Sequence, residues 1–542
     1  MTYADTVFRS NYVFTATDNE CRSGAVAIKG NRILSVGSDQ EVESCIGPDT
    51  KIIDCQDKLV MPGFFDDHTH FGDAAQTGTR FCFPLFGAKS ADECVERGKA
   101  HLAANPDLRR LYGFGWNPEN WDDPTMPTKE MLDEVFPDIP VYFQADVAHF
   151  IWANTKALEE SGISKEQEFR LGGPVKDENG ELTGIVYEIP AISPMVINAH
   201  DLTVEERMEI TPILIRNLNE LGVTSVTVVS GESFTNTTYN DYEAYKRLDE
   251  TMDGGLPLRM NLYPCMGSTG DFDIVRKLRD TYNSPKVKVC GLKQFVDGVP
   301  NLHTAFLKGN YADEPVNGNT FFPPETYAEV VTKANAEGFN VKMHAIGDQA
   351  VKIAIDAYEA SYEKNRGEGY VNCIEHVDLI DDPDIDRAAA CGTVMSIQPR
   401  HIILNQKSQP IVFGEERMNT KLYRYRSMVD RGCKICIGTD FPCVPIDPMV
   451  TVYAAITRAD LDGTPLNGNP DEALTLGETL RGYTYGSACA CGRGDELGTL
   501  EPGKLADLIV IDGPLFGEDP KAILDRKVLL TMVDGNVVFK RE

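Results

Sequence analysis

Apolar runs of strand length recur along the chain and alternate with stretches of helical periodicity. This alternation is typical of parallel units in which each β-strand is followed by an α-helix. Nine such runs can be counted in the middle of the chain. They cover residues 59–70, 141–149, 222–230, 258–265, 287–297, 340–346, 371–379, 393–398 and 434–440.

A (β/α)₈ barrel needs eight strands, one fewer than the pattern offers. The second run lies within a stretch from about residue 80 to 200 that breaks the rhythm and contains all three tryptophans. We therefore assign this stretch to an insertion after the first barrel strand, on the face where barrel enzymes keep their active sites. Two interpretations stay open: the insertion walls or covers a pocket, or it is a packed excursion with aromatic core residues.

Both ends of the chain have the pattern of short strands joined by turns. Near the N-terminus, Gly30-Asn31 separates two alternating runs, and near the C-terminus Asp534-Gly535-Asn536 does the same. We predict an α/β protein with a small β-sandwich domain built from both termini. The predicted parts are residues 1–58 (β-sandwich, first part), 59–490 ((β/α)₈ TIM barrel, with the insertion at about 80–200) and 491–542 (β-sandwich, second part).

Composition narrows the class of protein. The chain has 542 residues, of which 42% are hydrophobic, enough for a large buried core. Its 52 basic and 83 acidic residues give a formal net charge of −31, the wrong sign for binding nucleic acid or an anionic membrane surface. No apolar stretch reaches about 18 residues and the N-terminus lacks a secretory pattern. We expect a cytoplasmic homodimer that acts on a small molecule.

The fourteen cysteines are scattered along the whole length, several of them in apolar segments. This distribution favours reduced, buried thiols over a disulfide framework. One Cys-x-x-Cys motif, Cys433 to Cys436, lies in a strand-like run and has no second pair to complete a zinc site. We expect it to be structural.

Histidine is scarce, with nine in the chain, yet several stand at the C-terminal ends of the apolar runs. His68 and His70 are two positions apart in a strand, so their side chains point the same way. His344, His376 and Asp440 end later runs, and in an eight-strand count the five residues lie on strands 1, 5, 6 and 8. Together they predict a divalent metal site, with zinc as the first candidate and one or two ions per chain.

Lys293 lies in the run that would form strand 4. A protonated amine has no lone pair for a metal. An amine that has condensed with carbon dioxide becomes a carbamate, N6-carboxylysine, whose oxygens could bridge two metals. From the residues alone, an ion pair with Asp297 or another acid is the simpler interpretation.

The motifs in combination resemble the amidohydrolase superfamily, and most closely its amidohydrolase 3 branch of metal-dependent hydrolases, which includes N-substituted formamide deformylase. The resemblance runs nearly end to end. It is carried by Pro62-Gly63-Phe64 before His68-x-His70, Gly291-x-Lys293 with Asp297-Gly298, His344-Ala345-Ile346-Gly347-Asp348, Ile374-Glu375-His376, Gly438-Thr439-Asp440-x-Pro442 and Gly498 to Leu508.

The resemblance implies the same barrel and β-sandwich and a centre of one or two metals. His68 and His70 would hold the buried metal, and His344 and His376 the more exposed one. A carbamate on Lys293 would bridge the two. Asp440 would bind metal and move protons, taking one from the attacking water and passing it to the departing nitrogen.

We therefore expect hydrolysis of a non-peptide carbon–nitrogen bond of the amide type by metal-activated hydroxide, with Asp440 as the catalytic base. Deaminases of the superfamily usually carry glutamate three residues after the strand-5 histidine, where this chain has Gly347, so deamination ranks lower, although Glu375 and Asp348 could in principle serve in another way. An ester or lactone hydrolase would use the same centre. A metal-binding sensory protein without turnover is the non-enzyme alternative.

Five further residues are candidates for substrate binding because they fall on loops or in the insertion. Each has a structural alternative, and for Trp116 packing is the more ordinary role. The candidates are Asp297, His303, His149, Trp116 and Glu188.

Overall fold

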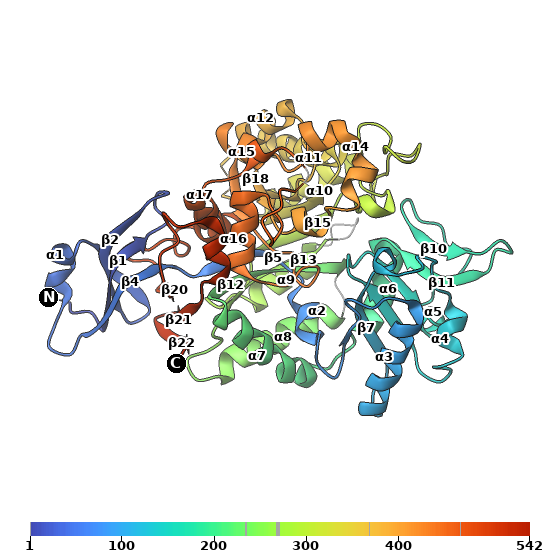
Figure 1. Ribbon diagram of the computed structural model, residues 1–542, viewed down its shortest axis with the longest axis horizontal. Helices are drawn as coiled ribbons and strands as arrows, with labels where there is room; N and C mark the ends of the chain where they lie inside the picture. The colour runs from blue at the N-terminus through green and yellow to red at the C-terminus, as the bar shows by residue number, and fades with distance from the viewer. Residues whose placement is uncertain (1, 234–235, 267–271, 368, 467) are drawn as a thin grey trace.

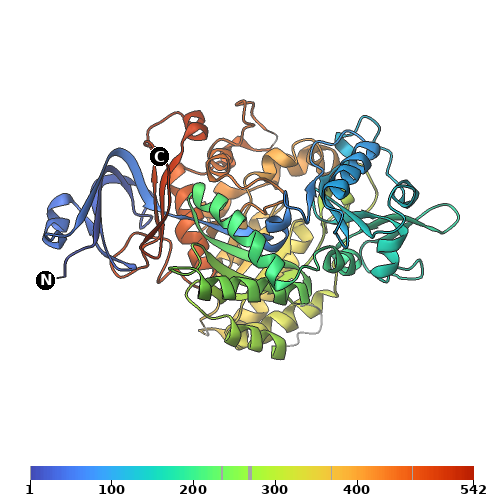
Figure 2. The ribbon, with the colours of Figure 1, turned by 90° about the horizontal axis from the view of Figure 1, so that it is seen from below.

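The structure is a computed structural model that describes residues 2–233, 236–266, 272–367, 369–466 and 468–542. Three parts follow one another along the longest axis, as Figures 1 and 2 show. A sheet from both chain ends lies at one side, a barrel surrounded by helices lies in the centre, and a second α/β part lies at the other side. The site described below lies where the barrel meets the second part.

Eight parallel strands form the barrel in the order in which they follow one another along the chain. The barrel closes because the amide of Asp440 donates to the carbonyl oxygen of His68 at 2.8 Å and the amide of His70 donates to that of Phe441 at 2.8 Å. The predicted (β/α)₈ barrel is confirmed. Its strands are β5 (Phe64–Thr69), β12 (Val223–Ser233), β13 (Arg259–Cys265), β15 (Gly291–Phe295), β16 (Asn340–Ala345), β17 (Asn372–His376), β18 (Val394–Ile397) and β19 (Lys434–Ile437), and β14 (Val287–Val289) also pairs with β13.

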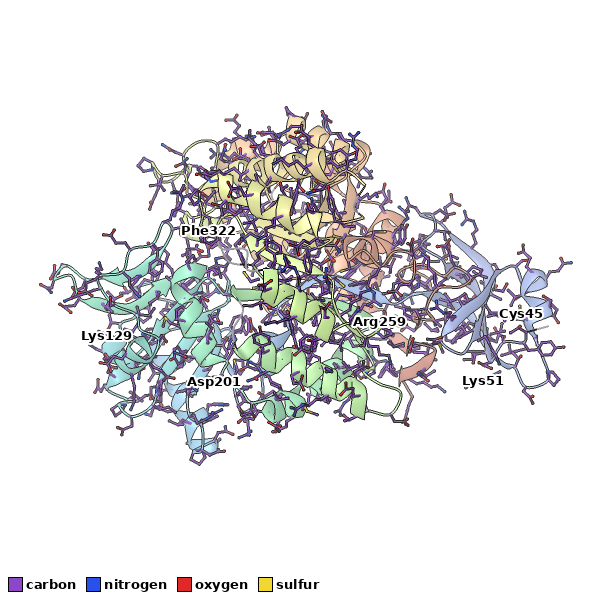
Figure 3. The ribbon with its side chains drawn as sticks, turned by 180° about the vertical axis from the view of Figure 1, so that it is seen from behind. Cys45, Lys51, Lys129, Asp201, Arg259 and Phe322 are labelled. Carbon is purple, nitrogen blue, oxygen red and sulfur yellow. The ribbon has the colours of Figure 1, made fainter. Side chains whose placement is uncertain are left out.

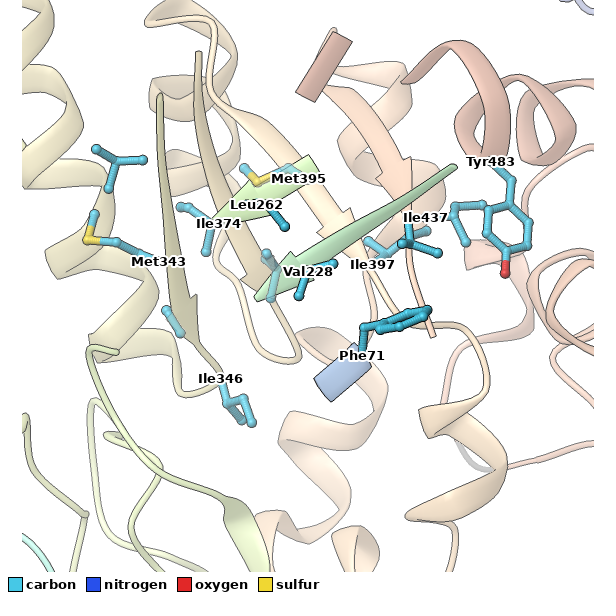
Figure 4. Packing of buried hydrophobic residues seen from close by; sticks show 14 of the residues in the cluster. Phe71, Val228, Leu262, Met343, Ile346, Ile374, Met395, Ile397, Ile437 and Tyr483 are labelled. Atoms are coloured by element: carbon cyan, nitrogen blue, oxygen red, sulfur yellow. The ribbon is translucent and has the colours of Figure 1, made fainter. Parts of the chain in front are cut away.

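Outward-facing apolar side chains of these strands pack beneath the surrounding helices. Figure 4 shows part of this core, with Val228, Met343 and Ile374 among its buried members. The alternation of a strand then turns the neighbouring residues, such as Lys342 and His344, toward the barrel interior. Helices that cover the barrel include α7 (Val204–Glu220), α8 (Asn236–Thr251), α9 (Phe272–Thr281), α10 (Pro324–Ala336), α11 (Asp348–Asn365), α12 (Asp382–Ala390), α15 (Tyr425–Asp430) and α16 (Pro448–Thr457).

A seven-stranded sheet joins the two chain ends, which confirms the predicted β domain. Strand β20 pairs antiparallel with β4, with Ile509 opposite Met61. The sheet is one continuous path that curls until Arg32 and Leu505 form a bridge. Its strands, in spatial order, are β22 (Asn536–Lys540), β21 (Val528–Val533), β20 (Leu508–Ile511), β4 (Lys51–Pro62), β1 (Thr6–Phe14), β2 (Cys21–Lys29) and β3 (Arg32–Gly37).

The segment between the first two barrel strands is the predicted insertion, and it has its own six-stranded sheet. The run 141–149 belongs to this sheet and not to the barrel. The three tryptophans pack together, with ring centres 5.4 Å apart for Trp116 and Trp121 and 6.0 Å for Trp116 and Trp152. The strands are β10 (Gly173–Lys176), β11 (Leu182–Tyr187), β9 (Phe150–Ala153), β8 (Val141–Ala145), β7 (Leu111–Trp116) and β6 (Phe83–Pro84), with helices α3 (Ala91–Ala104), α4 (Lys129–Asp133), α5 (Thr155–Glu160) and α6 (Ile189–Ala199).

All fourteen cysteines fall within the described residues, and none of them forms a disulfide. Reduced thiols were expected from their scattered positions. Within the described ranges, no helix has both the length and the apolar character needed to cross a membrane.

Buried charges connect the barrel to the terminal sheet. Arg259, at the start of β13, has no exposed surface, and Figure 3 labels its position. Its guanidinium lies 2.6 Å from Asp507 and 3.0 Å from Asp534, both of which belong to the terminal sheet or its turns. The Ala506-Asp507-Leu508 segment of the C-terminal motif thus has a structural role here.

Removing one of these carboxylates leaves a buried guanidinium partly unpaired. We expect Asp507→Asn to lower the free energy of unfolding by about 3 kcal/mol, measured by urea denaturation. Asp386→Asn, whose partner Arg431 lies at the surface, is the control and should change stability little. Equal effects of the two substitutions would contradict a role for the buried pair.

Candidate metal centre

Strands 1 and 8 of the barrel bring two imidazoles to one carboxylate. His68 is the fifth residue of β5, and His70 follows the strand directly. The Nε2 atoms of His68 and His70 lie 3.4 and 3.2 Å from the Oδ1 atom of Asp440, which comes three residues after β19. Asp440 has a φ of 65°, in the left-handed region that non-glycine residues rarely adopt. The ligand atoms of these three residues lie within 4.8 Å of one another, a spacing that suits a metal ion.

Strands 5 and 6 add two more imidazoles. The ring centres of His344 and His376 lie 4.5 Å apart, and those of His376 and His68 lie 5.0 Å apart. Among the described residues, the Nδ1 atoms of His344 and His376 are buried without a hydrogen-bond partner. Such atoms cost free energy unless something else binds them, so they fit ligands of a cation.

Lys293, on strand 4, is fully buried, and its amine has no hydrogen-bond partner in the part of the chain that the structure describes. Burial lowers the pKa of this amine. Burial is the largest influence that lowers the pKa values of His68 and His344, and the charge of Lys293 is the second. The amine therefore belongs to the same cluster, and none of the described acidic residues forms the ion pair that the simpler interpretation of Lys293 required.

Burial sets the protonation states of the cluster. It lowers the pKa of His68 to about 4 and those of His344 and His376 well below the usual value, so all three imidazoles are neutral near pH 7 and keep a lone pair for a metal. Burial would raise the pKa of Asp440, but the neighbouring imidazoles, led by His68, lower it below its usual range. Asp440 is therefore a carboxylate that can bind a cation or accept a proton.

A buried chain of charges orients His68. Its Nδ1 atom donates to Glu375 at 2.5 Å, which leaves Nε2 facing Asp440. The other Glu375 oxygen lies 3.0 Å from the amine of Lys342, which also lies 2.6 Å from Asp67. These three charged side chains lie inside the barrel. Asp67 and Glu375 each stand directly before a proposed ligand in the chain, and Lys342 stands two residues before one. Sequence analysis used Glu375 as part of a motif and as an alternative residue for a deaminase, and it missed Lys342 and Asp67, although charged residues within apolar runs were the available signal.

His401 is another residue that sequence analysis missed. It begins α13 (His401–Leu404) in the loop after strand 7. Its Nε2 atom lies 3.5 Å from Asp440, and its ring centre lies 5.8 Å from that of His376. His376, His401 and Asp440 form a second group whose ligand atoms lie close enough together for a metal. The available signal was its position just beyond a strand end.

A cavity of about 70 Å³ opens beside these groups. The insertion supplies part of its wall, including Val147, Ala148 and Ile189. Barrel residues such as Phe295 and Leu404 make the opposite parts of the wall apolar as well. The insertion therefore walls a pocket and also has an aromatic core of its own, so the two interpretations of this stretch hold together.

The five candidate substrate residues occupy different places. His149 lines the cavity, and Glu188 lies behind it. Asp297 also lies behind the wall, where it accepts from the amides of Phe306, Ile346 and Gly347 and lies 3.4 Å from Nδ1 of His344. His303 instead pairs with Asp313 at 3.0 Å and does not line the cavity. Trp116 is fully buried in the insertion core, where its ring nitrogen donates to the Phe143 carbonyl at 2.7 Å.

Glu375 should tune metal affinity through His68. Glu375→Gln removes the negative charge behind the imidazole, and we expect metal affinity to fall about 10- to 100-fold, measured by competition with a chromophoric chelator. Glu472→Gln is the control, because Glu472 is also buried but binds Arg424 and Ser427, and none of these three residues lines the cavity or belongs to a candidate metal group. Equal affinities in the two variants would contradict the orienting role.

Comparisons with known proteins identify the family of the chain. A model of the amidohydrolase family matches residues 51–539. The N-substituted formamide deformylase of Arthrobacter pascens is 27% identical over 536 residues, which cover 96% of this chain and 96% of that protein. Protein LONG AFTER FAR-RED 3 of Arabidopsis thaliana is 26% identical over 551 residues, which cover 99% of this chain and 92% of that protein.

A solved structure gives the same result for the fold. The crystal structure of an uncharacterized metal-dependent hydrolase from Pyrococcus horikoshii OT3 superposes with a TM-score of 0.72 at 27% identity, and the match covers 95% of this chain and 98% of that one. The similarity thus includes the barrel, the insertion and the terminal sheet. Because the family model spans nearly the whole chain, as the motifs predicted, the protein belongs to the amidohydrolase family.

Proposed function

We propose that the protein is a metal-dependent hydrolase that cleaves a non-peptide carbon–nitrogen bond of the amide type in a small molecule. The observation that carries the proposal is the convergence of neutral imidazoles and the carboxylate of Asp440 on one cavity, with the buried, unpaired amine of Lys293 in the same cluster. The similarity to an N-substituted formamide deformylase supports the choice of bond. That the protein is a cytoplasmic homodimer stays a prediction from sequence.

The donor set fits one or two divalent ions of borderline character, with zinc as the first candidate. His68, His70 and Asp440 would hold one ion, and His344 and His376 would hold the other. A bound ion would supply Lewis acidity and lower the pKa of a coordinated water from about 15.7 to about 7.

Lys293 would complete the centre as N6-carboxylysine. The lowered pKa of the buried amine favours its neutral form, whose lone pair can attack the carbon of carbon dioxide. A carbon–nitrogen bond forms, one proton leaves to solvent, and the product is an anionic carbamate. Its two oxygens would replace an amine that has no partner with ligands that a cation prefers.

Asp440 is the proposed general base. Its lowered pKa keeps it ionised, and its oxygens lie at the rim of the cavity between the imidazoles of His70 and His401. It would orient the attacking water and accept a proton from it as the oxygen bonds to the carbonyl carbon. The attacking water is the nucleophile in this scheme, so no covalent enzyme intermediate is needed.

The structure gives a physical reason for ranking deamination lower. A Cβ atom built at Gly347 would lie 2.1 Å from the backbone oxygen of Phe306, so a glutamate does not fit at this position. The Gly347 amide also donates to Asp297 at 2.9 Å. Ester or lactone hydrolysis uses the same groups, and esters therefore belong in the test below.

The proposal is tested with anilides of formic and acetic acid, cyclic amides and matched esters. We expect amide hydrolysis that a chelator abolishes and that added zinc restores. Asp440→Asn should keep the fold and lower kcat about a thousandfold or more, because it removes both a base and a ligand. Asp356→Asn on α11, which pairs with Lys352 and Arg387, is the control and should keep full activity. Turnover of esters alone, or turnover unaffected by chelation, would overturn the proposal.

The role of Lys293 is tested separately. Lys293→Ala should lose bound metal and activity, and acetate or propionate should restore part of both by replacing the carbamate oxygens. Loading the wild type with ¹³C-bicarbonate should give a carbamate signal in the NMR spectrum that the variant lacks. Full metal content and activity in a folded Lys293→Ala protein would rule out the bridge.

A further inference from the structure

The insertion contributes a histidine to the wall of the cavity and a glutamate behind it. His149 follows β8 and lines the cavity, and its ring centre lies 5.8 Å from that of His344. The Nδ1 atom of His149 lies 2.8 Å from Oε2 of Glu188. Glu188 has no exposed surface, so the pair is a buried one formed within the insertion.

Glu188 is held in place from several sides. Its second oxygen accepts a hydrogen bond from the hydroxyl of Thr304, which belongs to a barrel loop. Its amide donates to the His149 carbonyl at 2.7 Å. Cβ atoms built at Gly172 and Gly298 would lie 2.4 Å from atoms of Glu188, so only glycine leaves room for this side chain.

The backbone conformation of Glu188 also indicates that the surrounding contacts hold this residue in place. Its φ of 72° and ψ of 145° lie in a region that costs a non-glycine residue about 1–3 kcal/mol. Such a conformation persists where the surrounding contacts determine it, and it gathers at sites where a side chain must be aimed. Here the side chain so aimed is the partner of His149.

An ionised carboxylate only accepts hydrogen bonds, so Glu188 fixes the proton of the His149 ring on Nδ1. The remaining nitrogen, Nε2, lies on the other side of the ring and has no hydrogen-bond partner among the residues that the structure describes. His149 belongs to neither of the candidate metal groups at the cavity. An imidazole held by a buried carboxylate, with its second nitrogen free at a cavity, is the arrangement that proteins use for proton transfer.

We propose that His149 and Glu188 form a proton-transfer dyad that the insertion contributes to the barrel site. The proposal rests on the function proposed above. In its protonated form, His149 donates the Nε2 proton to the amide nitrogen as the carbon–nitrogen bond breaks. The bonding electron pair passes to nitrogen, the amine leaves neutral and the carbonyl re-forms as a carboxylic acid group. Asp440 then releases to solvent the proton that it took from the attacking water, and His149 regains a proton from solvent. Glu188 is the positioning residue.

In this assignment Asp440, on the barrel side of the cavity, takes a proton from the attacking water, and His149, on the insertion side, gives a proton to the leaving amine. Asp440 is enclosed by the imidazoles of His68, His70 and His401 at 3.2 to 3.5 Å, which suits the attacking water. The insertion wall around His149 carries Val147 and Ile189. A leaving amine that meets this wall therefore has an apolar substituent, which makes anilides suitable probes.

The test compares formanilide with 4-nitroformanilide, whose leaving amine needs less help from an acid. We expect His149→Gln to lower kcat about 100-fold or more on formanilide and about tenfold or less on 4-nitroformanilide, with metal content unchanged. Glu188→Gln should show the same pattern more weakly, together with a shifted pH profile. His101→Gln is the control, because that imidazole of the insertion binds the Arg80 carbonyl and does not line the cavity.

A readout without turnover accompanies the kinetics. In protein with ¹⁵N-labelled histidine, the neutral form of His149 should carry its single proton on Nδ1, and Glu188→Gln should alter that signal. Equal losses on both anilides, unchanged rates, or a loss of metal in His149→Gln would overturn the dyad. If the wild type cleaves only esters, the amide proposal fails on its own, and phenyl and 4-nitrophenyl acetate then test the dyad by the same criterion.

Discussion

The burial of unpaired donor atoms at the carboxyl end of the barrel is the constraint on which the site depends. Each buried polar atom without a hydrogen-bond partner costs about 1–3 kcal/mol, and among the described residues the amine of Lys293 and the Nδ1 atoms of His344 and His376 are in this condition, although Asp297 lies 3.4 Å from that of His344. Burial also keeps the imidazoles neutral. A cation that binds this cluster only in the folded protein would stabilise the fold, because binding lowers the free energy of the folded state and leaves that of the unfolded state unchanged.

The rest of the scaffold maintains that cluster. The strand ends set the positions of the ligands, and the interior charges of Asp67, Lys342 and Glu375 fix the direction of His68. The terminal sheet is joined to the barrel by buried ion pairs of Arg259. The insertion completes the cavity with a wall that includes His149, whose imidazole pairs with the buried Glu188.

Sequence predicted those features that follow from local pattern. The apolar runs gave the eight barrel strands, and the strand ends located His68, His344, His376 and Asp440, because parallel strands end on one face. Lys342 and Asp67 were missed because their charges are compensated only by partners on other strands. His401 was missed because it lies in a loop, where no periodicity marks the direction of a side chain. The position of His303 beside Asp313 was also not predicted, because it depends on contacts between loop residues that the local sequence pattern does not show.

The central claim is that metal binds at the strand ends, and crystallographic anomalous scattering at the zinc absorption edge tests it most directly. For protein purified without chelator and supplied with zinc, the account predicts one or two peaks at about 2.0–2.2 Å from nitrogens of the imidazoles and oxygens of Asp440. Density for a carboxylated Lys293 should lie between them if two ions are present. A cavity without metal, or a single ion held by Asp67, Cys373 and Cys436 below the site, would contradict the account.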